Sequence, residues 1–327
     1  MTEKRIFSGM RPTGSLHIGH LSVLQNWVSL QAEYECYYGI VDWHALTTGY
    51  DDHLDMNALI QEIALDWLSV GVDPQKSAIF VQSNVLEHAE LHLLLSMITP
   101  ISWLERVPTY KDQIQQLGKE EGKDLSTYGF LGYPALQAAD ILVYKADAVP
   151  VGEDQLPHIE LCREIARRFN FMYEAIFPEP QAIIGKIAML PGVDGRKMSK
   201  SYHNAISLTA DTQEIQTRVK QMITDPARVR KDDPGHPEIC VVHQFQQIYN
   251  PREVAQIETD CRAGKVGCVA CKAHLAATLE ELLAPFRERR VYWQEPGRVE
   301  RILREGRERA HTKAAETMRE VRQAMGL

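Results

Sequence analysis

Strand and helix signals alternate through the N-terminal part of the chain, and this alternation restricts the possible fold more than any other feature. Short apolar runs typical of strands occupy 5–8, 36–41 and 78–82, and apolar residues recur at helical spacing in 21–32 and 55–70. Strands that alternate with helices form a parallel sheet covered by helices. We therefore predict an α/β fold with its site beyond the carboxyl ends of the strands.

The remainder of the chain predicts a second domain. At about 150 residues per domain, the 327 residues correspond to two domains. Residues 84–130 are largely helical and polar, and the charged stretch 112–127 is expected to be an exposed connection. A loop-rich segment rich in proline and glycine covers 170–205, and mostly helical patterns follow it. We predict an α/β domain over 1–205, with the helical insertion around 84–130, and an all-helical domain over 206–327.

Composition and charge exclude several classes of protein. Apolar residues make up 44% and charged residues 24%, which is ordinary for a soluble globular chain. The richest apolar stretch, 91–101, is interrupted by Ser96, Thr99 and Pro100, so no membrane span is expected. Residues 1–5 do not resemble a signal peptide, which favours a cytoplasmic location. A net charge of −8 repels polyanions, so any nucleic-acid binding must use local basic surface.

A segment rich in glycine and histidine follows the first predicted strand. It reads Pro12-Thr13-Gly14-Ser15-Leu16-His17-Ile18-Gly19-His20. The N-terminus of a helix offers unpaired N–H groups and a positive dipole end, and both favour anions. Gly19 allows a phosphate or a planar ring to approach the backbone, and His17 and His20 lie on one side of a helical turn. Taken alone, such a histidine pair is more often a surface feature at a helix cap.

A second motif, Arg196-Lys197-Met198-Ser199-Lys200-Ser201, lies in the loop-rich segment. Lysine is a compact, mobile charge, so Lys197 and Lys200 can close over a polyphosphate. Taken alone, this motif is more typical of a solvated basic loop. The chain contains neither a GxxxxGK[ST] nor a GxGxxG segment, which excludes the commonest glycine-rich nucleotide loops.

The two motifs together are far more specific than either alone. A His-Ile-Gly-His segment followed by Lys-Met-Ser-Lys-Ser resembles the paired signatures of class I aminoacyl-tRNA synthetases. Segments 132–142, 149–155, 41–47 and 320–327 narrow the resemblance to the tryptophanyl branch. The resemblance covers nearly the whole chain in order. It implies a Rossmann-type catalytic domain, a helical domain that binds the tRNA anticodon, and a homodimer.

The resemblance also implies a reaction. The family activates L-tryptophan with ATP and Mg²⁺, then transfers the acyl group to the 3′ end of tRNA(Trp). Such a reaction needs positioning and electrostatic stabilisation more than a covalent protein partner. The implied catalytic residues are His17, His20, Lys197 and Lys200. The implied ATP-binding residues are Arg11, Pro12, Thr13, Gly19, His20, Gly152, Glu153, Asp154, Ala188, Lys197, Met198, Ser199, Lys200 and Ser201.

Asp140 matches the family's carboxylate that accepts the indole N–H. Indole is a donor without an acceptor, so a carboxylate is a suitable partner, and such pairing discriminates strongly against analogues that lack the donor. The other residues implied to bind tryptophan are Phe7, His44, Tyr133, Gln137, Val149 and Gln155.

Two residues depart from the usual pattern of the family. Many members have glutamine where this chain has Arg11, and an apolar residue where it has Gln137. Tyr133, Gln137 and Asp140 also resemble the pocket of some tyrosyl-tRNA synthetases, so tyrosine is the alternative substrate. A third hypothesis is a catalytically idle paralogue that binds tRNA or senses redox state.

Four of the six cysteines, Cys240, Cys261, Cys268 and Cys271, follow the spacing C-x20-C-x6-C-x2-C. In a reducing compartment such a set indicates a metal before a disulfide, and four thiolates suit Zn²⁺ or a [4Fe–4S] cluster. A subset of bacterial tryptophanyl enzymes carries a pattern of this form, so the resemblance implies the [4Fe–4S] cluster.

Two basic segments are candidates for tRNA contact. The run Arg228, Arg230 and Lys231 lies near the cysteines in the sequence and is the better candidate. The arginine-rich segment 286–309 alternates with glutamates, which favours a salt-bridged helix surface for most of its arginines.

Overall fold

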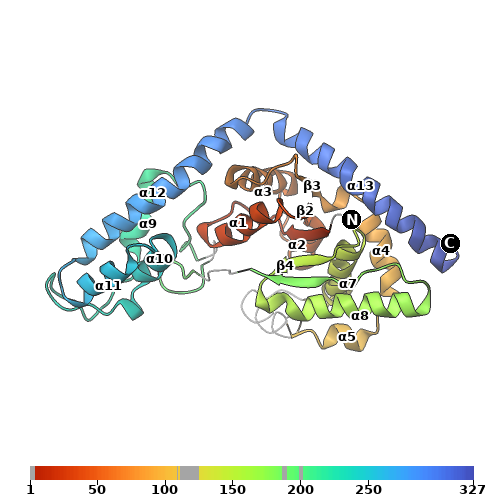
Figure 1. The fold of residues 1–327 in the computed structure, drawn as a ribbon, viewed down its shortest axis with the longest axis horizontal. Helices are drawn as coiled ribbons and strands as arrows, with labels where there is room; N and C mark the ends of the chain where they lie inside the picture. Colours follow the sequence, from red (N-terminus) through yellow and green to blue (C-terminus); the bar gives the residue numbers. More distant parts are fainter. Residues whose placement is uncertain (1–3, 109, 111–124, 186–189, 199–201) are drawn as a thin grey trace.

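The computed structural model describes residues 4–108, 110, 125–185, 190–198 and 202–327. Five strands form one parallel sheet in the order β3-β2-β1-β4-β5 (Figure 1). The strands are β1 (Arg5–Met10), β2 (Glu35–Ile40), β3 (Ser77–Val81), β4 (Ala148–Val151) and β5 (Gln181–Ile184). This confirms the predicted parallel α/β fold. The strand order changes direction between β1 and β4, and such a switch point opens a crevice at the carboxyl ends of the strands.

Helices connect the strands and cover both faces of the sheet (Figure 1). They are η1 (Ile18–His20), α1 (Leu21–Leu30), α2 (Asp42–Gly49), α3 (Met56–Val70), η2 (Gln82–Asn84), α4 (Glu87–Ser96), α5 (Ile101–Glu105), α7 (Tyr128–Leu142), η3 (Glu153–Gln155) and α8 (Leu156–Met172). Local chemistry sets their ends, as in α3. The side chain of Asp55 accepts the N–H of Ala58 at 3.1 Å, and Gly71 ends the helix with a φ of 119°.

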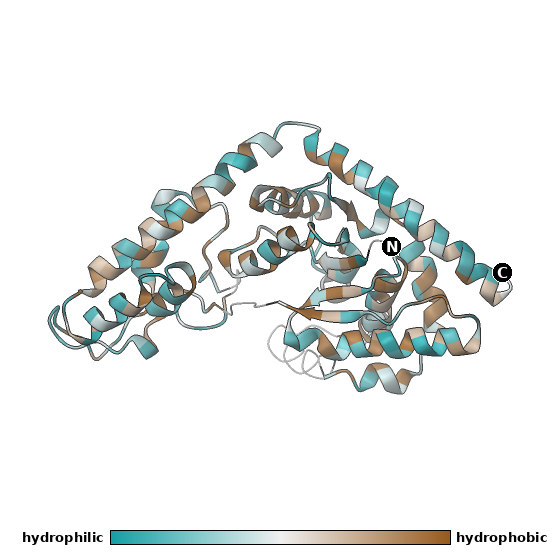
Figure 2. Ribbon diagram, viewed as in Figure 1, coloured by the Kyte–Doolittle hydropathy of each residue, from teal (hydrophilic) through white to brown (hydrophobic). Residues whose placement is uncertain are grey.

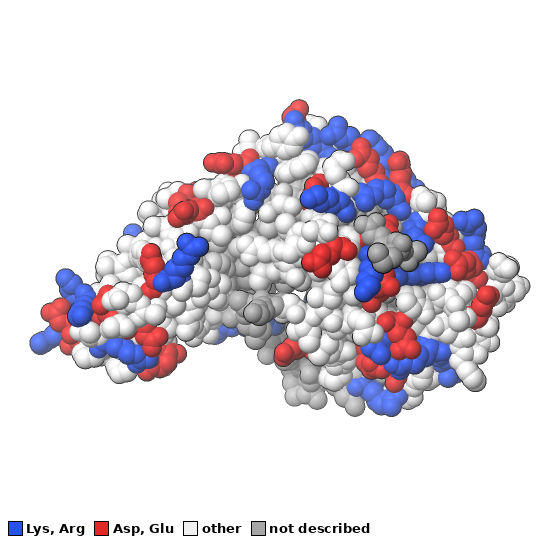
Figure 3. Space-filling view, viewed as in Figure 1, with Lys and Arg blue, Asp and Glu red and all other residues white. Residues whose placement is uncertain are grey.

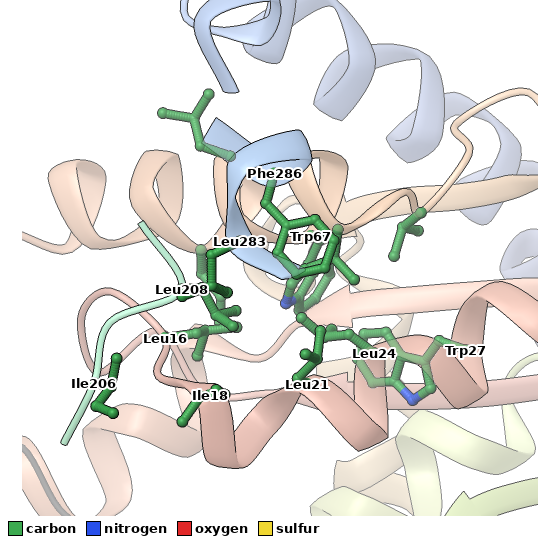
Figure 4. Packing of buried hydrophobic residues seen from close by; sticks show 14 of the residues in the cluster. Leu16, Ile18, Leu21, Leu24, Trp27, Trp67, Ile206, Leu208, Leu283 and Phe286 are labelled. Carbon is green, nitrogen blue, oxygen red and sulfur yellow. The ribbon is translucent and has the colours of Figure 1, made fainter. Parts of the chain in front are cut away.

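Alternate residues of the strands enter two separate cores. In β1, Ile6 packs with α1 and α3 on one face, whereas Phe7 packs with α7 and α8 on the other. Figure 2 shows apolar residues along the inner sides of these helices and polar residues outside. Figure 4 shows the first core, where the rings of Trp27 and Trp67 meet edge to face with centroids 5.0 Å apart. The polar side chains at the carboxyl ends of the strands belong to neither hydrophobic core.

The regular elements described after β5 are all helices, as predicted for 206–327. They are α9 (Thr212–Gln221), η4 (Pro237–Ile239), α10 (Val241–Tyr249), α11 (Val254–Arg262), α12 (Cys268–Trp293) and α13 (Arg298–Met325). In Figure 1, α12 rises from the group of α9, α10 and α11, and α13 returns along the sheet at β3. A Cβ on Gly306 would lie 1.9 Å from the carbonyl oxygen of Ile79, so α13 lies directly on that strand. The final helix thus shares the core of the sheet, and the division at 205/206 stays a prediction.

Two further predictions concern membranes and the insertion. The described helices include none with the length and apolar character needed to cross a bilayer. Most of the charged connection predicted for 112–127 lies outside the described residues; only 125–127 are described.

Candidate active site

A cavity of about 390 Å³ lies at the carboxyl ends of β1 and β4, where the strand order changes direction. All the residues predicted to bind tryptophan line it, together with two of those predicted to bind ATP. They are Phe7, His44, Tyr133, Gln137, Asp140, Val149 and Gln155, with Arg11 and Gly152. Residues far apart in the sequence therefore meet in one place because the parallel topology brings the ends of the strands together.

Asp140 of α7 is the buried acid of this cavity, with 1% of its surface exposed. Its Oδ2 accepts a hydrogen bond from Nε2 of His44 at 2.9 Å, and its Oδ1 accepts one from Nδ1 of His88 at 2.7 Å. Nε2 of Gln82 lies 2.7 Å from Oδ1 and 2.9 Å from Oδ2. The hydroxyl of Tyr144 bonds the other nitrogen of His88 at 2.7 Å. The carboxylate is therefore fixed in orientation by three donors.

The hydrogen bonds around Asp140 also fix its charge. Burial alone would raise its pKa, but the hydrogen bonds and charges of His44 and His88 lower the pKa to about 2. Asp140 is therefore ionised at neutral pH and is a strong acceptor. Neither Gln82 nor His88 was among the predicted site residues. Both follow β3 closely in the sequence. The rule that sites lie beyond the carboxyl ends of strands could therefore have identified them as candidates.

A second polar group lines the cavity beside Asp140. The hydroxyl of Tyr133 lies 2.8 Å from Nε2 of His158. Burial is the largest cause that lowers the pKa of His158, to about 4, so this imidazole is neutral at pH 7. Gln155 donates to Oδ2 of Asp154 at 2.9 Å, and Nη1 of Arg11 lies 3.5 Å from Oγ1 of Thr48. Among its described lining residues, the cavity thus offers oriented neutral groups, the cation Arg11 and the buried anion Asp140.

The first signature motif forms the turn before α1. Nδ1 of His17 accepts the N–H of Gly19 at 3.2 Å, so the ring proton resides on Nε2, the nitrogen that can donate to a phosphate. Nδ1 of His20 lies 3.3 Å from the N–H of His17 and completes a capping box. A Cβ on Gly19 would lie 2.9 Å from the His17 ring, so a larger residue here would displace that ring. The predicted residues Pro12 and Thr13 lie in the preceding loop.

The second signature motif contacts the first. Sδ of Met198 lies 3.5 Å from the position that a Cβ on Gly19 would take. The side chain of Lys197 is exposed, while its carbonyl accepts the side-chain amide of Asn204 at 3.1 Å. Asn204 is 1% exposed and was not predicted as a site residue. The predicted residues Ala188, Ser199, Lys200 and Ser201 lie outside the described residues.

The four clustered cysteines lie close enough to influence one another: Cys240 precedes α10, Cys261 lies in α11, and Cys268 and Cys271 share α12. The charges of the other three thiols contribute to the pKa of Cys271, which burial, the largest cause, raises to about 11. Burial also raises the pKa of Cys240 and Cys261. Arg228 donates to Sγ of Cys261 at 3.7 Å, and Gln246 donates to Sγ of Cys271 at 3.9 Å. These N–H donors suit thiolates.

The thiols are close to one another but do not converge on one centre. Within the described part of the chain, no group of three or more His, Cys, Asp or Glu side chains has a geometry that would hold a metal ion. The donor set thus fits an iron–sulfur cluster in residue type and proximity but not in the arrangement seen here. The predicted cluster stays a prediction.

The two basic segments differ in how their charges are used. Lys231 and Arg230 are exposed, and the stem of Lys231 lies 3.2 Å from the Cβ position of Gly267, next to Cys268. In segment 286–309, by contrast, several arginines are paired within the protein, such as Arg301 with Glu305. The others include Arg287, Arg290 and Arg298, which pair with Glu280, Glu62 and Glu295. Figure 3 shows basic and acidic side chains interspersed on this face.

Comparison with known proteins agrees with this geometry. The profile of the family described as tRNA synthetases class I (W and Y) matches residues 2–284. The tryptophan–tRNA ligase of Thermotoga maritima is 53% identical over 99% of this chain and 99% of its own. That of Aquifex aeolicus is 46% identical over 99% of this chain and 100% of its own. A structure of tryptophanyl-tRNA synthetase from Campylobacter jejuni, complexed with ADP and tryptophane, covers 99% of this chain and 100% of that chain, with 30% identity and a TM-score of 0.87. The chain therefore belongs to the class I tRNA synthetases of the tryptophan and tyrosine family.

Proposed function

We propose that this chain is a tryptophan–tRNA ligase, which joins L-tryptophan to tRNA(Trp) at the expense of ATP. One observation carries the proposal: all the residues expected to bind tryptophan line a single cavity whose buried anion is Asp140. The full-length relatives named tryptophan–tRNA ligase support tryptophan over tyrosine as the substrate.

In this proposal Asp140 accepts the indole N–H. Each oxygen of its carboxylate already has two donors within 2.9 Å, so an entering indole N–H must replace or share one of them. His44 is the donor to replace, because it lines the cavity while Gln82 and His88 do not. Tyr133 and Gln155 then hold the α-amino group, and Phe7 and Val149 pack the ring. Discrimination follows because substrates without the N–H leave the carboxylate poorly paired.

The adenylation step needs no covalent bond to the protein. An oxygen of the tryptophan carboxylate attacks the α-phosphorus of ATP, the bond from that phosphorus to the bridging oxygen breaks, and pyrophosphate leaves with the electron pair. His17 and His20 donate to the phosphates, Lys197 follows the departing pyrophosphate, and Gly152 lies where the ribose would bind. Mg²⁺ bound to ATP would supply neutralisation of the phosphate charge.

The second step transfers the tryptophanyl group to tRNA(Trp), and we assign tRNA contact to the helical region 206–327. The exposed side chains of Arg230 and Lys231, with the half-buried Arg228 beside them, offer positive charge to phosphates. Nearby, a cavity of about 270 Å³ can accept an unstacked base. Its lining is Pro237, Glu238, His243, Gln244, Gln247, Glu258 and Arg262. Charging of tRNA(Trp) with labelled tryptophan tests the whole proposal, and absence of charging by folded enzyme would support an idle paralogue instead.

We assign a [4Fe–4S] cluster to the clustered cysteines. Support comes from their spacing, their proximity and the N–H donors from Arg228 and Gln246. Protein purified without oxygen is expected to contain iron and sulfide at a ratio of about 4:4 and to be brown. Cys268→Ser is expected to lower the iron content to less than about a quarter, whereas Cys36→Ser leaves it unchanged because Cys36 lies in the core of the sheet. Stoichiometric zinc without iron would refute the assignment.

We also propose that the chain forms a homodimer. Apolar side chains of α4, α5 and the adjoining turns are more than half exposed, which is typical of an interaction surface. They are Leu86, Leu93, Met97 and Ile101. Met97→Glu is expected to convert a dimer to a monomer in light scattering, because it places a charge in an apolar interface. Val291→Glu, at an exposed apolar residue of α12, is the control that should stay dimeric. A dimer that persists in both variants would place the interface elsewhere.

The cytoplasmic location expected from the sequence stays a prediction.

A further inference from the structure

One buried carboxylate connects the first signature motif to the C-terminal helices. Asp66 of α3 is 1% exposed. Its Oδ2 accepts the main-chain N–H of Leu16 at 2.6 Å, and its Oδ1 accepts Nη1 of Arg290, on α12, at 2.6 Å. Leu16 immediately precedes His17. Asp66 therefore lies between the loop that carries the phosphate-binding histidines and a helix that extends into the tRNA-binding region.

Arg290 is also held by a second carboxylate of α3. It is 9% exposed, and its Nη2 donates to Oε2 of Glu62 at 2.6 Å, one turn before Asp66 on α3. Figure 4 shows Leu283 and Phe286 of α12 packed beside Trp67, next to the loop that contains Leu16. The planar guanidinium bridges two carboxylates, which a single point charge cannot do equally well.

The loop at Leu16 depends on such outside contacts. It follows Gly14, whose φ is 111°, and it is held by chain segments that come later in the sequence. The N–H of Ile18 donates to the carbonyl of Ile206 at 2.9 Å, and the carbonyl of Leu16 accepts the N–H of Leu208 at 3.1 Å. Catalysis by positioning is sensitive to displacements of about 1 Å, so these contacts bear directly on where His17 and His20 lie.

We propose that Asp66 and Arg290 are positioning residues for adenylate formation, which couple the placement of α12 to the loop of His17. The inference rests on the proposed function. Arg290 orients the carboxylate of Asp66, the carboxylate fixes the backbone at Leu16, and the backbone places the histidines. A shift of α12 is therefore transmitted to the ATP side of the site. The residues expected to bind tryptophan lie on β1, α2, α7, β4 and η3, outside the loop of Leu16.

If Arg290 only held α12 against α3, removing any other contact between these helices would have the same effect. Arg289 makes such a contact and distinguishes the two roles. Arg289 also ties α12 to α3, because its Nε donates to the carbonyl of Ser69 at 2.6 Å and its Nη2 to that of Val70 at 3.3 Å. Its guanidinium donates to these main-chain carbonyls, whereas the guanidinium of Arg290 donates to the carboxylate of Asp66. Removing Arg289 loosens the same pair of helices without disturbing the carboxylate that holds Leu16.

The experiment compares Arg290→Met, Arg290→Lys and Arg289→Met in tryptophan-dependent exchange of pyrophosphate into ATP, below the unfolding temperature of each variant. Arg290→Met is expected to lower kcat/KM for ATP by about tenfold or more, with KM for tryptophan unchanged within about twofold. Arg290→Lys is expected to recover part of this loss, and Arg289→Met to stay within about threefold of the wild type despite a lower Tm.

Equal effects of Arg290→Met and Arg289→Met, or a loss in KM for tryptophan as large as that for ATP, would overturn the inference. If Arg290→Met does not fold, Arg290→Lys decides, because wild-type kcat/KM for ATP in that variant would contradict the bridging role. Lack of exchange by the wild-type enzyme would contradict the proposed function itself, and the inference would fall with it.

Discussion

Asp140→Asn is expected to lower tryptophan-dependent exchange of pyrophosphate into ATP by at least about a hundredfold. The neutral amide has one acceptor oxygen and one donor nitrogen, whereas the site of Asp140 presents three donors. The amide nitrogen would therefore face a donor from Gln82, His44 or His88, and the indole N–H would lose its ionised acceptor. Most of the loss should come from weaker binding of tryptophan, which a rise in KM reports.

The control for this prediction is Asp147→Asn. Asp147 is a half-buried carboxylate that accepts the N–H of Arg5 at 2.8 Å and does not line the cavity. It should stay within about threefold of the wild type, since its amide oxygen can still accept that hydrogen bond. Equal activity of Asp140→Asn and the wild type would show that the indole is held elsewhere.

The lowered pKa of Asp140 makes the stability of the folded state depend on pH in a definite direction. Its folded-state pKa of about 2 lies below the ordinary value of 3.8, so ionisation of this group favours the folded state above pH 3.8. That contribution is lost as the pH falls through 3.8 toward 2. KM for tryptophan should consequently show no titration of Asp140 between about pH 6 and 9.

Lys197→Ala is expected to lower kcat for the exchange by about a hundredfold, with KM for tryptophan unchanged. The exposed side chain carries a charge that acts on the leaving pyrophosphate, so its loss is felt in the transition state. The backbone should keep its place because Asn204 holds the carbonyl of residue 197 rather than its side chain.

Arg196→Ala provides a matched loss of charge on the same loop. Its guanidinium pairs with Asp194, with Nη2 and Oδ2 2.6 Å apart, so its charge is already used within the loop. This variant should stay within about threefold of the wild type. Equal losses at residues 196 and 197 would mean that the general charge of the loop matters, and an unchanged rate in Lys197→Ala would remove that residue from the mechanism.

The regular elements could be predicted because their signals are local. The apolar run 36–41 became β2 (Glu35–Ile40), and the helical pattern 55–70 became α3 (Met56–Val70). The short helix α2 (Asp42–Gly49) was missed because it begins directly after a strand and has little apolar periodicity. The return of α13 to the sheet was not predictable either. Periodicity shows that a helix has a buried face, but not that Gly306 will lie against Ile79.

The site was predictable to the extent that its residues lie in recognisable segments. Asp140 and Tyr133 belong to one such segment, and their cavity follows from the ends of β1 and β4. The donors Gln82 and His88 do not belong to a recognisable segment. The sequence does not show which polar residue after a strand points inward. The same holds for Asp66, whose partners lie 50 and 224 residues away.

The most direct test of the account is amino-acid-dependent exchange of pyrophosphate into ATP, with tryptophan and tyrosine in separate reactions. The cavity with Asp140 as the indole acceptor predicts exchange with tryptophan and none above background with tyrosine. Exchange with tyrosine alone would mean that Gln137 and Asp140 hold a phenol hydroxyl, and it would contradict the assignment of this cavity.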